Sequence, residues 1–354
     1  MAPRSYIMSA SALNTTMAAS NFYELLLRKG PQNGDVVAAL DELRHKIVAD
    51  GIPSNSDGMS ELRIYVWLIL LNSPPIATDI YLDLVRQGAS PAYSKIRNDT
   101  FRTLATDPLF RRRVTENSLT RVLNAVAWKL QDAHEARING WLSPPSSLNN
   151  DQITSPDTSM HSRSSLAGTT QDGSQMGDKT DYVGYVQGMN VLAAPFLYAA
   201  RSESEAFVAF DRLLQSECPG YIRGSMEGVH NGLKLVDEIL QICDPKLYHY
   251  LYSKGLNASI YAFPSVLTMC ACTPPLPEVL QLWDFLFAYG THINVVCIVA
   301  QLVMIRDQIL GADSPNQVLR SFPPLQANKI KMLALTFIKR IPQDAYQRLV
   351  DHAK

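Results

Sequence analysis

The chain is organised around a short uncharged stretch, GYVQGMN at residues 184–190. This stretch follows a polar segment and precedes an apolar run, Val191–Ala200, so we expect it to form the turn that starts a buried helix. None of its side chains is an acid, a base or a nucleophile at neutral pH. Its possible chemistry is hydrogen bonding, for example between the amide of Gln187 and a water molecule.

The composition indicates a protein with a substantial core. Its 354 residues are 46% hydrophobic and 18% charged, and 32 basic against 33 acidic residues leave a net charge of −1. A general nucleic-acid binder would show a large basic excess and a membrane-surface binder a polybasic cluster, so we expect neither. No segment has the length and apolarity of a membrane span, so we expect no membrane insertion.

Known catalytic and metal-binding patterns are absent from the sequence. It contains no GxxxxGK[ST], HExxH or GxSxG motif, and its seven histidines are scattered. The five cysteines are odd in number and lack CxxC spacing, which is typical of a reduced intracellular chain. We therefore expect no metal site and a cytoplasmic protein.

Apolar residues recur at helical spacing along most of the chain, which predicts an all-α fold of roughly a dozen or more helices. Val36, Leu40, Leu43 and Ile47 mark one face of a helix that opens at Asp35. Further helices are expected at residues 60–72, 78–87, 119–130, 191–200, 203–214, 229–252 with a break at Asp244-Pro245, 276–289, 293–310, 330–340 and 343–353, with 253–268 irregular.

Two segments depart from this helical pattern. Residues 143–181 are mostly small or polar and cannot bury enough apolar surface to offset the entropy of ordering. We expect a disordered insertion inside one domain, at 35–350, because the same pattern resumes after it. Residues 1–19 are also mostly small and polar, and predict a flexible N-terminus.

A second polar stretch, IRNDTFRT at residues 96–103, places Asp99 and Arg102 on one face if it is helical. Taken alone, Arg102 has the pattern of a solvated helix arginine. Gln187 has that of a capping or backbone-bonding residue. The residues by themselves leave a catalytic role for either side chain open.

Together these stretches make the chain similar to a TBC domain, the GTPase-activating module first defined for Rab GTPases. Residues 96–103 fit the family's pattern IxxDxxRT, and residues 185–190 fit YxQGMN. Leu62-Arg63 with Trp67 resembles its first block, and Trp283-Asp284 its WD block. The resemblance covers about residues 35–350 and implies a multi-helix TBC fold.

The resemblance implies a role for each motif residue. Arg102 would be an arginine finger, placed against the phosphoryl group that a bound GTPase transfers. Gln187 would be a glutamine finger that positions the attacking water, and both would act in trans. Asp99 would orient Arg102, and Tyr185 and Gly188 would set the backbone that aims Gln187.

The remaining motif residues would hold the fold; they are Arg63, Trp67, Trp283 and Asp284. The chain would then need no cofactor and would carry out no independent reaction. It would act on GTP and Mg²⁺ that are bound to the partner GTPase.

The sequence departs from the family's usual pattern in one segment, and this indicates which branch of the family it resembles most. Many relatives have an arginine and a tryptophan after the YxQGMN helices, where this chain reads YAFPS at 261–265 and CACTPP at 270–275. Together with the compact size and WDFLFAYG at 283–290, this makes the chain most similar to the fungal mitotic-checkpoint branch. That branch implies the catalytic half of a two-component activator, with a separate scaffold subunit. It also implies a small Ras-like GTPase at the spindle pole body or cytoskeleton that controls mitotic exit or septation.

Three alternatives remain. The chain could be a non-catalytic TBC adaptor that holds a GTPase or a scaffold, although many adaptors would have lost one finger and this chain has both. It could be a Rab activator in vesicle traffic. An α-helical groove for a lipid or a partner would explain the apolar content but not the ordered motifs.

Overall fold

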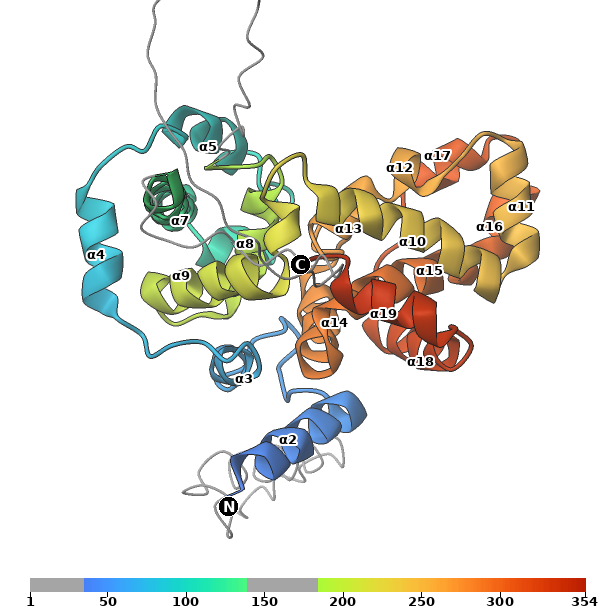
Figure 1. The fold of residues 1–354 in the computed structure, drawn as a ribbon, viewed down its shortest axis with the longest axis horizontal. Helices are drawn as coiled ribbons and strands as arrows, with labels where there is room; N and C mark the ends of the chain where they lie inside the picture. Colours follow the sequence, from blue (N-terminus) through green and yellow to red (C-terminus); the bar gives the residue numbers. More distant parts are fainter. Residues whose placement is uncertain (1–34, 139–183) are drawn as a thin grey trace, which may run out of the picture.

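A computed structural model describes residues 35–138 and 184–354, and within these ranges every regular element is a helix or helical turn and none is a strand (Figure 1). The prediction of an all-α fold is therefore confirmed. The segments predicted to be flexible or disordered, 1–19 and 143–181, lie outside the described residues. None of the described helices is long and apolar enough to cross a membrane.

The helices before the gap and just after it are α2 (Val36–Asp50), α3 (Arg63–Leu70), α4 (Thr78–Arg86), α5 (Tyr93–Thr100), α6 (Pro108–Arg113), α7 (Glu116–Ile138), α8 (Met189–Ala199) and α9 (Glu203–Arg212). A π-helical turn η1 (Leu213–Glu217) and a 3₁₀ turn η2 (Pro219–Tyr221) lead to the rest. These are α10 (Glu227–Cys243), α11 (Pro245–Ser253), α12 (Ala258–Tyr261), α13 (Phe263–Leu267), α14 (Leu276–Tyr289), η3 (Thr291–Ile293), α15 (Asn294–Met304), α16 (Arg306–Gly311), α17 (Pro315–Arg320), α18 (Ala327–Ile338) and α19 (Gln343–Asp351).

Helix α14 lies at the centre of the molecule, between the half that holds α3–α9 and the half that holds α10–α13 and α15–α19 (Figure 1). It contacts α2, α3 and α8 as well as α18. Two of these contacts are made by buried aromatic rings that pack on Trp283 of α14. The ring centroid of Trp67, from α3, lies 5.7 Å from that of Trp283, and the centroid of Phe196, from α8, lies 5.1 Å from it. These tilted and edge-on contacts add to the burial of large apolar surfaces.

A buried ion pair ties α3 to α14. The side chains of Arg63 and Asp284 are 1% and 2% exposed, and Arg63 Nε lies 3.0 Å from Asp284 Oδ1. Arg63 Nη2 donates to Asp284 Oδ2 at 3.0 Å, and Trp67 Nε1 donates to Oδ1 at 2.8 Å. Arg63 also donates to the carbonyl of Gly58. These bonds offset the cost of removing both charges from water.

Most of the predicted helices are confirmed, although α7 spans Glu116–Ile138 and not the predicted 119–130. Asp35 caps α2 by accepting a bond from the backbone N–H of Ala38 at 3.0 Å, and Asp244-Pro245 separates α10 from α11. The prediction that Val36 belongs to the apolar face of its helix is wrong, because its side chain is 70% exposed. Helix α2 packs through its later turns, where Leu43 and Ile47 are buried.

Two predictions about the second half of the chain are wrong. Residues 253–268 are not irregular but contain α12 and α13, and the first of these is capped by the side chain of Asn257. Residues 293–310 are not one helix, because the backbone leaves helical geometry at Ile305 (φ −105°, ψ 15°) between α15 and α16. No proline or glycine marks that break in the sequence.

Candidate functional site

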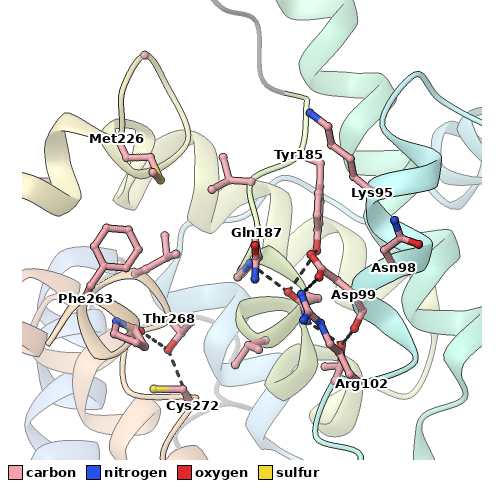
Figure 2. A pocket seen from close by; sticks show the side chains of 18 residues that line it. Lys95, Asn98, Asp99, Arg102, Tyr185, Gln187, Met226, Phe263, Thr268 and Cys272 are labelled. Atoms are coloured by element: carbon pink, nitrogen blue, oxygen red, sulfur yellow. Dashed lines mark hydrogen bonds and ion pairs between the residues drawn. The ribbon is translucent and has the colours of Figure 1, made fainter. Parts of the chain in front are cut away.

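A hollow of about 1000 Å³ opens where α5, the turn before α8 and the α13 segment meet (Figure 2). It is lined by residues of both central motifs, including Asp99, Arg102, Tyr185, Gln187 and Gly188. Arg102 and Gln187 are 85 positions apart in the chain (187 − 102). The fold therefore brings the two predicted finger residues to the walls of a single cavity.

Helix α5 supplies one wall because of the way its last turn is buried. Ile96 is completely buried, and this holds Asp99 and Thr100 against the protein as well. The chain then leaves α5 in a tight turn, in which Arg102 N donates to the carbonyl of Asp99 at 3.3 Å. This turn brings the Arg102 side chain back over the carboxylate of Asp99.

The carboxylate of Asp99 connects the two motifs. Its Oδ1 accepts a bond from the Arg102 guanidinium, and its Oδ2 lies 2.8 Å from the hydroxyl of Tyr185. Burial, together with the bond to Asp99, raises the pKa of Tyr185, so this hydroxyl stays protonated and donates. The side chain of Asp99 is 7% exposed whereas that of Arg102 is 53% exposed. The guanidinium is therefore anchored at one edge and open to solvent at the other.

Asn190 and Thr103 extend this connection. Asn190 Oδ1 accepts from Gly188 N at 3.1 Å, and Asn190 Nδ2 donates to Thr103 Oγ1 at 2.8 Å. The hydroxyl of Thr103 in turn donates to the carbonyl of Asp99 at 2.9 Å. Sequence reasoning assigned no role to either residue. The spacing of one helical turn between Asp99 and Thr103 could have indicated that these two residues interact. The bond between Thr103 and Asn190 joins residues 87 positions apart, and no local pattern in the sequence indicates it.

Gly188 is required by the geometry of the turn that carries Gln187. Its φ of 108° lies in the region that side chains with a Cβ rarely adopt. A Cβ added to it would also lie 2.7 Å from Leu267 Cδ2. The turn holds Gln187 at the exposed mouth of the hollow, where its amide bonds to no other side chain or backbone group of the described residues.

The opposite wall of the hollow is apolar. It is formed by Met226, which precedes α10, and by Phe263, Pro264 and Leu267 of α13 (Figure 2). Cys272 lies near the floor of this wall. The wall thus includes part of the segment in which the sequence departs from the motifs of many TBC domains.

Comparisons with known proteins agree with this geometry. The sequence model of the Rab-GTPase-TBC domain family matches residues 179–310. Cell division control protein 16 of Schizosaccharomyces pombe is 42% identical over 93% of this chain and 92% of its own length. Mitotic check point protein BUB2 of Saccharomyces cerevisiae is 38% identical over 89% of this chain and 92% of its own length.

The chain belongs to the RabGAP-TBC family. The predicted resemblance is therefore confirmed, and TBC domains of this family are GTPase-activating modules. Two solved structures share the fold at 18% identity. The Ypt/Rab-GAP domain of Gyp1p has a TM-score of 0.64, with 92% of this chain and 98% of that chain covered. A Chlamydomonas flagellar RabGAP TBC domain has a TM-score of 0.56, with 99% and 97% covered.

The other motif residues of this TBC domain lie away from the hollow. The side chains of Arg63, Trp67, Trp283 and Asp284 are all buried in the core between α3 and α14. Their contacts are the ion pair and the aromatic cluster described above, and Trp283 Nε1 also donates to the carbonyl of Met269 at 2.9 Å. The two sets of motif residues are thus separated in space.

The hollow of this TBC domain presents the guanidinium of Arg102 and the amide of Gln187. The described residues that line it include no histidine, and the carboxylate among them, Asp99, is already bonded to Arg102 and Tyr185. Such a site suits a reaction that depends on positioning and charge stabilisation more than on proton transfer by the protein. The described residues contain no cluster of three or more His, Cys, Asp or Glu that could hold a metal ion.

Proposed function

We propose that this chain activates a small Ras-like GTPase by supplying Arg102 and Gln187 in trans. One observation carries the proposal: both side chains line a single hollow, and both have groups left open to a partner. Asp99 and Tyr185 connect the two segments that carry them. Within the part of the chain that the structure describes, the one group that would compete with a partner's nucleotide for these side chains is Asp99, which bonds one edge of the guanidinium.

Arg102 stabilises the charge that develops on the transferred phosphoryl group. Its planar guanidinium carries a permanent charge and five N–H donors, and only part of this set is used by Asp99. The remaining donors reach phosphate oxygens at the exposed edge. An arginine finger of this kind accelerates hydrolysis by about 10³- to 10⁵-fold.

Gln187 orients the attacking water, in place of a glutamine of the GTPase. A primary amide both donates and accepts, so it can hold a water through one atom and a phosphate oxygen through the other. GTP and Mg²⁺ belong to the partner GTPase, and this chain contributes no cofactor and no separate reaction of its own.

The names of the two fungal relatives support a role in cell-cycle control, since one is a cell division control protein and the other a mitotic checkpoint protein. The chain is then the catalytic half of a two-component checkpoint activator that regulates mitotic exit or septation. A separate scaffold subunit recruits it from the cytoplasm to the spindle pole body or cytoskeleton. Residues 35–350 form its one domain.

Single-turnover GTP hydrolysis by a panel of Ras-like and Rab GTPases tests this function. The full chain is added alone and together with a scaffold protein that co-purifies with it. Arg102→Ala and Gln187→Ala should each remove most of the stimulation.

Arg86→Ala on α4 is the matched control, because Arg86 also pairs with an aspartate three residues away, at 2.7 Å, but lies outside the hollow. Stimulation that survives both finger substitutions contradicts the proposal. Tight binding of a GTPase without acceleration would identify the chain as an adaptor instead.

A further inference from the structure

The polar wall of the hollow carries a second cation. Lys95, Asn98, Asp99 and Arg102 recur three and four residues apart, so they follow one face of α5 into the turn after it (Figure 2). Lys95 is exposed, and within the described residues it has no ion-pair partner. The other cation of α5, Arg97, is paired with Glu116 of α7 at 3.0 Å.

This wall therefore has an excess of positive charge, although the chain as a whole has a net charge of −1. It presents Lys95 and Arg102 against one carboxylate, Asp99, which already pairs with Arg102. Among residues 35–138 and 184–354, no carboxylate pairs with Lys95. A cavity with such an excess favours a partner surface that brings a carboxylate.

The position of Lys95 indicates which part of a GTPase it meets. Lys95 lies in the first turn of α5, whereas Arg102 lies beyond the end of this helix at Thr100, and the Lys95 side chain points away from Arg102 (Figure 2). When Arg102 contacts the transferred phosphoryl group, Lys95 lies well to one side of that group. It then faces the protein surface around the nucleotide and not the phosphate itself.

The apolar wall faces Lys95 across the hollow (Figure 2). Met226 is held in the left-handed region at φ 60°, two residues after Gly224 at φ 53°. A left-handed methionine is strained, and such residues persist where the surrounding structure holds them in place. Here the loop turns Met226 toward the hollow beside Phe263, and both side chains are only half-buried.

We propose that the two walls select the GTPase by binding one surface segment that carries a carboxylate next to an apolar side chain. Lys95 pairs with the carboxylate, while Met226 and Phe263 pack against the apolar side chain. A GTPase with a basic residue at that place is rejected by charge repulsion. This inference rests on the proposed function and names the residues that determine the choice of partner.

Charge reversal tests the polar wall. The probe is the GTP-loaded Ras-like GTPase that the unmodified chain stimulates most strongly in the panel described above. Lys95→Glu should lower kcat/KM about tenfold or more at low salt through KM, with kcat nearly unchanged, and the loss should shrink as salt rises. Lys246→Glu is the matched control, since Lys246 is exposed on α11 in the other half of the molecule and should have no effect.

Polarity exchange tests the apolar wall. Met226→Gln keeps the size of the side chain and should raise KM several-fold at every salt concentration, while Met226→Leu should restore most of the affinity. Met332→Gln, at a 63% exposed methionine of α18, controls for the change of residue type. Thermal melting of each variant controls for loss of fold.

A compensating change in the GTPase identifies the carboxylate that pairs with Lys95. Exposed Asp and Glu residues around its nucleotide are changed singly to Lys, and one of these changes should restore activity with Lys95→Glu. The inference is overturned if none does so, or if Lys95→Glu leaves KM unchanged while Arg102→Ala still abolishes stimulation. If Arg102→Ala leaves stimulation intact, the proposed function fails instead.

Discussion

Two of the arginine–aspartate pairs in the molecule, Arg63–Asp284 and Arg102–Asp99, have the same chemistry but differ in their surroundings. Arg63 and Asp284 are 1% and 2% exposed, and each makes further hydrogen bonds within the core. Arg102 and Asp99 are 53% and 7% exposed, so only the carboxylate is buried. The first arrangement confines both charges inside the protein, whereas the second presents the cation at the surface.

Because of this difference, we expect the buried pair to contribute to stability and the half-exposed pair to contribute to activity. In the buried pair Nε, Nη1 and Nη2 of the arginine each donate a bond within the core, so the guanidinium is turned toward the protein and away from any ligand. In the half-exposed pair the carboxylate of Asp99, itself held by the hydroxyl of Tyr185, binds one edge of the guanidinium and leaves the other edge open to solvent. Substitutions at the two arginines should therefore have opposite consequences, and the predictions below test this from the largest effect to the smallest.

Arg102→Ala should reduce GTPase stimulation by about 10³- to 10⁵-fold, equivalent to about 4–7 kcal/mol of barrier. Arg102→Lys should lose most of the same stimulation, because a lysine cannot match the planar fork of donors. Single-turnover hydrolysis measures both variants. Stimulation by Arg102→Lys equal to that of the unmodified chain would mean that charge alone matters.

Arg63→Ala should lower the free energy of unfolding by about 3–5 kcal/mol, because it leaves the carboxylate of Asp284 buried without its cation. Denaturant unfolding measures this loss. The double variant Arg63→Met with Asp284→Leu should lose less than the sum of the two single variants. An additive result would show that the pair is not coupled in the way the structure indicates.

Tyr185→Phe keeps the ring but removes the bond to Asp99, and should cost about 1–3 kcal/mol of stability. Because Arg102 then loses part of its anchor, stimulation should also fall, by about tenfold to a hundredfold. Tyr198→Phe is the matched control, since its hydroxyl bonds to the carbonyl of Asp57 at 2.8 Å outside the hollow. That variant should lose stability without a specific loss of stimulation.

Arg102→Ala should change the free energy of unfolding by about 1 kcal/mol or less, because its partly exposed pair is weakened by solvent. Urea denaturation of this variant beside Arg63→Ala compares the two pairs directly. Equal losses of stability would remove the distinction between them.

Much of the fold could be predicted from local signals. The cap at Asp35 and the proline after Asp244 set helix ends through short-range bonds, and α14 begins and ends where the sequence indicates. The errors arose where packing overrides those signals. The break at Ile305 carries no proline or glycine, and the exposure of Val36 depends on which turns of α2 are covered.

The candidate site was predictable in its parts but not in its connections. Asp99 and Arg102 lie three residues apart, so their pairing followed from helical spacing. The proximity of Arg102 to Gln187 was expected only from resemblance to a family, since a separation of 85 positions in the sequence carries no information about distance in space. The bonds from Tyr185 to Asp99 and from Asn190 to Thr103 exist only once the fold is formed.

The central claim is that this chain provides both the cation and the water-positioning amide. Single-turnover hydrolysis by a GTPase whose own catalytic glutamine is replaced by alanine tests it most directly. The account predicts that the unmodified chain still stimulates this GTPase strongly, and that Gln187→Ala abolishes the effect. If the glutamine-free GTPase binds the chain as tightly as before but its hydrolysis is not accelerated, Gln187 does not replace the missing glutamine and the account is contradicted.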